Sequence, residues 1–308
     1  MSQLVVLGSV NADHVLHVER FPRPGETCHG HNYQIIGGGK GANQAVAAAR
    51  LGCDVSFIAC IGDDTFGRSM SDRFVNELID TSMLMTVPDM ATGLAMIQVA
   101  PSGENSICIA SEANAHLTSQ RVMPYQDKIA AAKMLLIQLE TPLDGILTAA
   151  RAAVKGGTQV VLNPAPAQIL SDELLSCVDM ITPNETEAEI LTGIQIVDEP
   201  SAAKAAKVLH DKGIATVIIT LGQKGAWVSE LGQGWLSGGF SVKAVDTTAA
   251  GDTFNGALVS SLTKEHDMEQ SLRFAHAAAA LSVTKSGAQS SIPHYQDVIH
   301  FLGSQCCA

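Results

Sequence analysis

The sequence predicts an α/β protein with a mostly parallel central sheet, helices on both faces, and a small additional β-sheet. From residue 117 to about 225, short apolar runs alternate with helical patterns, which is typical of right-handed βαβ units. Two earlier stretches, about 12–36 and 92–112, interrupt that rhythm with β-like pieces. The chain has 308 residues and is 46% hydrophobic, which is enough for a well-buried core.

The first half of the chain opens with an expected strand, followed by polar residues that include Asn11 and Asp13. Such a pair is either a simple turn or part of a ligand site at a strand's carboxyl end. We expect strands at 3–8 and 54–61, helices at 45–51 and 65–79, and a hairpin of 92–100 with 105–110 around the turn 101–104. The two interruptions are expected to pair into a small sheet that covers a ligand as a lid, or meets the lid of a second copy.

In the second half the expected elements alternate regularly. Helices are expected at 118–132, 143–155, 172–177, 202–211 and 253–263, and strands at 134–139, 158–162, 179–182, 215–221 and 240–245. In a parallel sheet the carboxyl ends of the strands share one edge. That edge would collect Asn11, Asp13, Glu140, Asn184, Gly222 and Asp246.

The stretch 246–256 holds the main candidate for chemistry. Small residues at Ala249, Ala250 and Gly251 precede a helical pattern, and Asp252 falls in its first turn. Unpaired amides at a helix start bind anions, and a neighbouring carboxylate can take a proton from a hydroxyl. This combination suits phosphoryl transfer to an alcohol. The alternative is that Asp252 only caps the helix, as acidic residues often do.

A glycine-rich turn at 37–44 supports two interpretations. Gly37, Gly39 and Ala42 fit the loose dinucleotide pattern G-x-G-x-x-A, and Asp63 follows at about the expected ~20 residues, so a nicotinamide enzyme is an alternative. Lys40 and Asn43 instead suit the hydroxyls of a polyol, although an exposed lysine often has no function. The turn is not a P-loop, because it lacks that motif's first glycine and its final serine or threonine.

Other positions have equally simple alternatives. Glu140 could start the next helix, and Asn184 with Glu187 has the spacing of a capping box as well as that of a site for metal-bound water. Gly222 and Gly225 could belong to an ordinary turn. The functional interpretation depends on all of these groups meeting at one edge.

Composition excludes several classes of function. The net charge is −12 without a Lys/Arg cluster, so nucleic acid is not an expected partner. No apolar run reaches the ~18 residues of a membrane span and no basic leader precedes the first one, so we expect a cytoplasmic protein without a membrane partner. The seven cysteines, including Cys306 and Cys307 in an expected loose tail, form no metal-ligand spacing or paired framework.

These motifs together resemble the ribokinase-like carbohydrate kinase superfamily over essentially the whole chain. Gly38-Gly39-Lys40-Gly41-Ala42-Asn43 is similar to its N-terminal signature, and Asp246-Thr247-Thr248-Ala249-Ala250-Gly251-Asp252 to its C-terminal one. Asn11-Ala12-Asp13 and the segment 183–187 match as well. Ala249 replaces the glycine of the general pattern, which narrows the resemblance to the ribokinase branch.

The resemblance implies a single kinase domain over 1–308, with its lid at about 12–36 and 92–112. It implies ATP-dependent phosphorylation of D-ribose at the 5-hydroxyl, giving ribose 5-phosphate and ADP, with Mg²⁺ and an activating K⁺. Other acceptors in the same superfamily, such as deoxyribose, fructose and adenosine, remain alternatives, and a dehydrogenase is a remote one. It also implies a homodimer formed through the lid.

Roles follow from the resemblance for the matched positions. The sugar hydroxyls would be held by Asn11, Asp13, Gly39, Lys40, Asn43, Glu140 and Asp252. Asp252 would be the base, beside an anion hole at Ala249, Ala250 and Gly251. ATP and Mg²⁺ would contact Asn184, Glu187, Thr220, Gly222, Gly225, Gly251 and His276. K⁺ would be bound by Asp246, Thr248, Ser282, Lys285, Gly287 and Ser291, several through backbone carbonyls.

Overall fold

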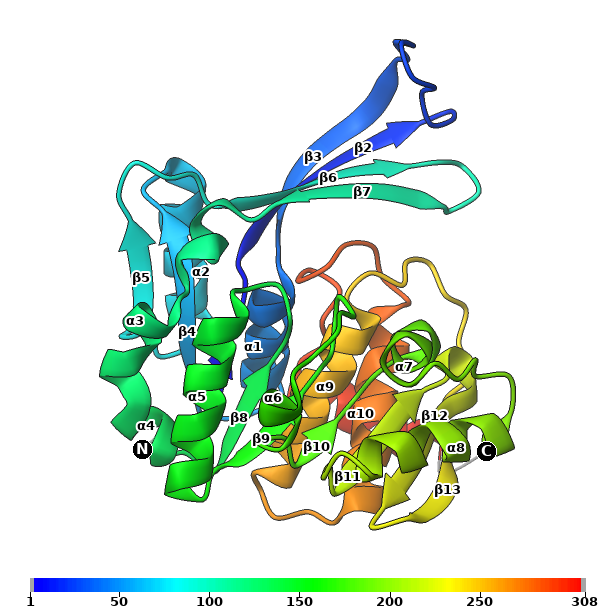
Figure 1. Cartoon of the computed structure of the whole chain (residues 1–308). Helices are drawn as coiled ribbons and strands as arrows, with labels where there is room; N and C mark the ends of the chain where they lie inside the picture. The colour runs from blue at the N-terminus through cyan, green and yellow to red at the C-terminus, as the bar shows by residue number, and fades with distance from the viewer. Residues whose placement is uncertain (1–2, 306–308) are drawn as a thin grey trace.

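The computed structural model describes residues 3–305, so the expectations for Cys306 and Cys307 lie outside the described residues. It contains a large sheet covered by helices and a small sheet that extends away from the body above it (Figure 1). The predicted fold class is confirmed.

The large sheet has nine strands in the order β13-β12-β11-β10-β9-β8-β1-β4-β5. All neighbouring pairs are parallel except β11 with β12 and β12 with β13, which are antiparallel. The strands are β1 Leu4–Leu7, β4 Val55–Gly62, β5 Leu84–Val87, β8 Met134–Ile137, β9 Gln159–Leu162, β10 Met180–Ile181, β11 Thr216–Thr220, β12 Gly225–Glu230 and β13 Gln233–Gly238.

Side chains alternate between the two faces of the sheet, so β1 contributes to two separate cores. Leu4 and Val6 pack in one core, and Val5 and Leu7 in the other. The first core includes residues of α1 Lys40–Arg50, α2 Thr65–Asn76, α9 Ala250–Leu262, α10 Met268–Ser282 and α11 Tyr295–Gln305. The second includes residues of α3 Ser119–Val122, α4 Gln126–Ala130, α5 Leu143–Gly156, α6 Asp172–Leu175, α7 Glu185–Thr192 and α8 Glu199–His210.

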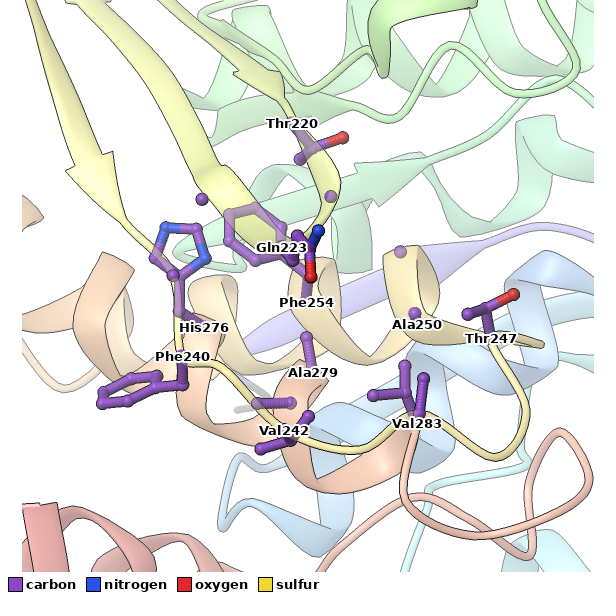
Figure 2. A pocket seen from close by; sticks show the side chains of 16 residues that line it. Thr220, Gln223, Phe240, Val242, Thr247, Ala250, Phe254, His276, Ala279 and Val283 are labelled. Carbon is purple, nitrogen blue, oxygen red and sulfur yellow. The ribbon is translucent and has the colours of Figure 1, made fainter.

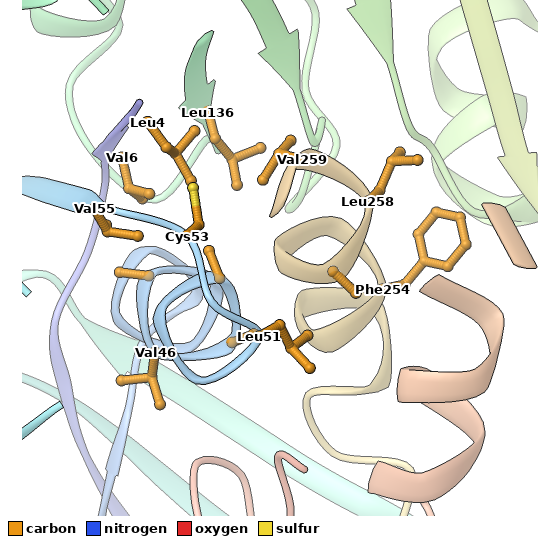
Figure 3. Close-up of a cluster of buried hydrophobic side chains, with 14 of the residues drawn as sticks. Leu4, Val6, Val46, Leu51, Cys53, Val55, Leu136, Phe254, Leu258 and Val259 are labelled. Atoms are coloured by element: carbon orange, nitrogen blue, oxygen red, sulfur yellow. The ribbon is translucent and has the colours of Figure 1, made fainter. Parts of the chain in front are cut away.

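Helices α1 and α9 lie side by side in the first core, where they meet the apolar face of the central strands (Figure 3). Their contact depends on a small residue, because a Cβ atom on Gly256 would lie 2.5 Å from Cβ of Ala47 and 2.8 Å from the carbonyl oxygen of Gln44. This close approach brings the start of α9 against α1.

The small sheet has the order β3-β2-β6-β7 and leaves the body directly after β1 (Figure 1). Its strands are β2 Asn11–Val18, β3 Gly30–Gly38, β6 Gly93–Val99 and β7 Asn105–Ala110. Asp13 lies opposite Ile36 on β3 and Ala95 on β6. The predicted hairpin is therefore present, and the two interruptions of the βα rhythm do pair with each other.

Several predicted boundaries are wrong. Residues 240–245 are not a strand but an extended connection whose Phe240 and Val242 cover a cavity, so Asp246 does not follow a strand. The helix expected at 118–132 is three short pieces, α3, η2 Met123–Tyr125 and α4, because Pro124 interrupts it. Helix α1 begins at Lys40 rather than at residue 45, so residues 40–44 of the glycine-rich turn are helical.

Some elements were not predicted. Strand β5 and the hairpin of β12 with β13 extend the large sheet at its two ends. Two short 3₁₀ segments, η1 Glu112–His116 and η3 Gly222–Lys224, connect strands. Between residues 3 and 305 no helix is long and apolar enough to cross a bilayer, and the five described cysteines are all free.

Candidate active site

Helix α9 starts with the predicted base in its first turn. Its N-cap, Ala249, has φ of 59° and ψ of 15°, a left-handed conformation that turns the chain into the helix. The amide of Ala250 donates to the carbonyl of Thr247 at 3.2 Å, whereas those of Gly251 and Asp252 have no acceptor within residues 3–305. Two free amides at the positive end of a helix form an anion site.

The carboxylate of Asp252 is 6% exposed and is held from the neighbouring helix. Asn43 Nδ2 donates to Asp252 Oδ2 at 2.9 Å, and Gln44 Nε2 donates to Asp252 Oδ1 at 2.9 Å. One of these donors, Asn43, was expected at the site. The other, Gln44, was not, because a glutamine in a run of small residues has no distinctive sequence signal.

Asp13 and Asn11 lie where β2 begins, close to the glycine-rich turn. A Cβ atom on Gly38 would lie 2.0 Å from Asp13 Oδ2, so only glycine leaves room for this carboxylate. Gly39 has φ of 89°, and its added Cβ would lie 2.8 Å from the amide nitrogen of Asn11. The two glycines therefore let the start of α1 approach the small sheet.

Buried polar partners hold the other expected sugar ligands. Ser9 Oγ donates to Glu140 Oε2 at 2.5 Å, and the amide of Lys40 donates to the same oxygen at 3.1 Å. Asn114 Nδ2 donates to Asn11 Oδ1 at 2.8 Å. Glu140 is thus bound to the start of α1. The sequence had given no reason to select Ser9 or Asn114.

The site is rich in carboxylates around one lysine. Burial raises the pKa of Asp13 to about 7, and the negative charges of Glu140 and Asp252 add to the shift. Burial works against the charge of Lys40, but Asp252, Glu140, Glu187 and Asp13 together raise its pKa above the ordinary lysine value. Burial also raises the pKa of Glu187. Lys40 is therefore a partly buried cation with acids around it rather than a free surface lysine.

Two adjoining cavities lie at the start of α9, and Asp13 lines neither of them. The smaller, about 210 Å³, is polar and is lined by Lys40, Asn163, Ala165, Thr182, Asn184, Glu187, Thr220, Thr247, Ala249, Ala250, Gly251, Asp252 and Asn255. The larger, about 420 Å³, is mainly apolar and shares Thr220, Thr247, Ala250 and Gly251 with it. A polar compartment at a helix start beside an apolar one matches the phosphates and base of a nucleotide.

The larger cavity lies between β11, α9, α10 and the connection 240–245 (Figure 2). His276 is 7% exposed, lies 5.1 Å from the ring of Phe254, and its buried Nε2 has no hydrogen-bond partner among the described residues. Burial lowers its pKa to about 4. A neutral imidazole with an unused nitrogen can bond a ligand in this cavity.

The capping interpretation of residues 184 and 187 is confirmed. Asn184 accepts from the amide of Glu187 at 2.8 Å, and Glu187 Oε2 accepts from the amide of Asn184 at 2.9 Å. Both residues also line the polar cavity, so the cap does not remove them from it. Gly222 and Gly225, in and after η3, line the apolar cavity, and Gly225 has φ of 102°.

The expected cation residues lie in two segments, 246–248 and 282–291, which the side chain of Asp246 connects by hydrogen bonds. Its Oδ1 accepts from the amide and hydroxyl of Thr248 at 2.9 and 2.6 Å, and its Oδ2 accepts from the amide of Gly287 at 2.8 Å. Burial opposes ionisation, but these bonds hold the pKa of Asp246 below its usual value. Ser282, Lys285 and Ser291 belong to the same second region, in which the amide of Lys285 donates to the carbonyl of Ser282 at 3.2 Å.

The dinucleotide interpretation of the glycine-rich turn fails on topology. Gly37 and Gly38 belong to β3, a strand of the small sheet. A dinucleotide fingerprint requires a strand of the main parallel sheet before its helix, and α1 has no such strand directly before it. Asp63 forms an exposed ion pair with Arg68.

The fold and the site define a small-molecule kinase: a buried carboxylate is hydrogen-bonded to Asn43, one of the expected sugar ligands, and lines a polar cavity that adjoins an apolar one, beside free helix amides. The family model for pfkB family carbohydrate kinases matches residues 1–295. The chain belongs to this family.

Individual relatives match the chain over nearly its full length. A ribokinase of Haemophilus influenzae is 60% identical over 299 residues, which cover 97% of this chain and 98% of the relative. A deoxyribokinase of Salmonella typhi is 36% identical, covering 97% and 98%. The structure of an Arabidopsis thaliana ribokinase complexed with ribose and ATP matches with a TM-score of 0.91 at 32% identity, covering 98% of both chains.

Proposed function

We propose that this protein transfers the γ-phosphoryl group of ATP to the 5-hydroxyl of D-ribose, giving D-ribose 5-phosphate and ADP. The single observation that carries the proposal is the position of Asp252, bonded to Asn43 on one side and lining the polar cavity on the other. The 60% identity to a ribokinase, against 36% to a deoxyribokinase, favours ribose among related acceptors.

The chemistry follows from this placement. Asp252 takes the proton of the 5-hydroxyl as the sugar oxygen forms a bond to the γ-phosphorus of ATP. The bond from that phosphorus to the bridging oxygen breaks, and its electron pair leaves with ADP. The amides of Gly251 and Asp252 and the charge of Lys40 stabilise the negative charge on the transferring group.

The sugar would be held by acceptors that suit neutral hydroxyls. Asn11, Asp13, Asn43 and Glu140 supply them, and the buried Oδ1 of Asn43 has no partner among the described residues. Negative charge at Asp13 and Glu140 would repel a phosphorylated sugar and so favour release of the product.

The two cavities fit ATP and its metal ions. The apolar cavity, with His276 and Gly225, would hold adenine and ribose, and Asn184 would contact the phosphates. Glu187 would bind Mg²⁺ through water, which shields phosphate charge. The two segments connected by Asp246 offer one carboxylate and backbone carbonyls, a donor set suited to K⁺, which would support the anion site electrostatically.

The small sheet would act as a lid and as the contact between two copies. Ile35 and Met96 both lie opposite His14, on the face away from Asp13, and they are 47% and 52% exposed. Exposed apolar side chains on one sheet face favour burial against a second copy. Sedimentation would test this, since a monomer at micromolar concentration argues against the dimer.

An ATP-consumption assay against ribose, deoxyribose, fructose and adenosine tests the proposed function. We expect ribose to give the highest kcat/KM. A higher value for deoxyribose would reassign the acceptor, and no transfer to any of the four would overturn the proposal. In the same assay, activity in Na⁺ equal to that in K⁺ would count against the cation site.

The role of Asp252 has its own test. Asp252→Asn keeps the size and the fold, so ribose binding measured by calorimetry should persist while kcat falls by a factor on the order of 10² or more. Wild-type turnover in this variant would remove Asp252 from the role of base.

A further inference from the structure

A chain of buried amides reaches Asp252 from inside the protein. Gln138 Nε2 donates to Gln44 Oε1 at 2.7 Å, and Gln44 Nε2 donates to both Asp252 Oδ1 and Asn163 Oδ1 at 2.9 Å. Gln44 is 0% and Gln138 1% exposed, and neither lines either cavity. These two side chains are therefore out of reach of ligands in both cavities.

The direction of this chain follows from chemistry. A carboxylate only accepts hydrogen bonds, so Gln44 must turn its NH₂ group toward Asp252. Its carbonyl oxygen then faces Gln138, which must donate. Asn163 accepts from Gln44 and donates from Nδ2 to the carbonyl of Thr182 at 3.2 Å, so its orientation is consistent as well.

The same hydrogen-bond network also reaches Gly251, at the proposed anion site. Thr182 Oγ1 donates to Asn255 Oδ1 at 2.6 Å, and Asn255 Nδ2 donates to the carbonyl of Gly251 at 2.9 Å. The base and the free amides are thus linked to one network, which joins α1 and α9 to residues that directly follow β8, β9 and β10. Hydrogen bonds among buried side chains fix their relative orientation. In this network Gln138 Oε1 is left without a partner among the described residues, whereas the bonds that reach Asp252 are all formed.

We propose that Gln44, itself oriented by Gln138, is a positioning residue that fixes the Asp252 carboxylate for proton transfer. The role rests on the proposed function through the assignment of Asp252 as base. With one donor from Asn43 on Oδ2 and one from Gln44 on Oδ1, the carboxylate cannot rotate about its Cβ–Cγ bond without losing both. Misplacing a reacting group by about 1 Å can cost on the order of 10² in rate.

The main test is Gln44→Met, which keeps the length of the side chain and removes the amide. We expect kcat to fall on the order of 10- to 100-fold, while KM for ribose and for ATP changes less than about threefold, since Gln44 touches neither ligand. Gln138→Met should give a smaller fall of about 3- to 10-fold, because it frees Gln44 without removing its donor.

A double variant separates positioning from a general structural effect. If Gln44 acts through the base, Gln44→Met should not lower the residual kcat of Asp252→Asn any further. Thr158→Val is the matched control: its buried hydroxyl donates to the carbonyls of Ile129 and Ala132, both at 2.9 Å, away from the site. It should lose stability and keep kcat.

The outcomes distinguish this role from the proposed function. No transfer by the wild type overturns both. An active wild type with an unchanged kcat in Gln44→Met, or a multiplicative loss in the double variant, overturns only the positioning role. Should Gln44→Met lack a cooperative unfolding transition, Gln138→Met decides, and full kcat there refutes the proposal.

Discussion

Asp13 should make the folded protein less stable as the pH rises toward 7. Its side chain is 7% exposed, and burial followed by the charges of Glu140 and Asp252 raises its pKa from 3.8 to about 7. Between these values the folded state binds a proton that the unfolded state has released. Stability linked to this group is therefore present at low pH and lost as the pH rises through the folded pKa.

The size of the effect follows from the shift. At 1.36 kcal/mol per pKa unit, the folded state is disfavoured by about 1.7 kcal/mol at pH 5 and about 4.3 kcal/mol at pH 8. Asp13→Asn removes the titration. The stability of the variant relative to the wild type should therefore increase by about 2.6 kcal/mol between the two pH values.

Urea unfolding of both proteins at pH 5 and pH 8, without ligands, measures this difference, because all other titrating groups are shared. Asp72→Asn, on the exposed side of α2, measures what the same exchange does outside the site. A stability difference for Asp13→Asn that is the same at both pH values would refute the reasoning. The variant should also bind ribose more weakly, because the carboxylate that destabilises the fold is one of the proposed sugar ligands.

Three further outcomes are expected. Gly38→Ala should raise KM for ribose at least about tenfold, because the new Cβ would lie 2.0 Å from Asp13 Oδ2, whereas Gly238→Ala, with nothing within 4 Å, should behave as wild type in the same assay. Ala249→Val should lower both kcat and the unfolding free energy, the latter by about 1–2 kcal/mol, since a β-branched residue resists φ of 59°, while Ala249→Gly should keep kcat. His276→Phe should raise KM for ATP by about 3- to 10-fold, and because the pKa of His276 is about 4, that KM should not titrate with this group between pH 6 and 8.

Part of the candidate site could be selected from local chemistry, and the rest from the resemblance to a family. Asp252 in the first turn of α9 and Asn43 in the glycine-rich turn are indicated by local chemistry, whereas the role of Gly39 at the sugar site follows only from the resemblance. The βα rhythm gave the fold class, and the alternating strands around the turn at 101–104 gave the hairpin.

Other expectations were wrong because the same sequence pattern is compatible with more than one local structure. Residues 240–245 alternate between apolar and other side chains as a strand does. Their backbone forms no strand, however, and their apolar side chains line a cavity. The periodicity of 118–132 continued through Pro124, where the helix breaks. Strand β5 and the hairpin of β12 with β13, at the two ends of the large sheet, lack a strong sequence pattern of their own.

The sequence by itself determined which residue types are present for the chemistry, because a helix start, a glycine turn and a carboxylate are local features. Only the tertiary structure decided how they are oriented. Ser9, Gln44, Asn114 and Gln138 are ordinary polar residues in the sequence. They acquire roles because Gly256 lets two helices meet and parallel strands bring distant segments to one edge, where buried polar groups must find partners.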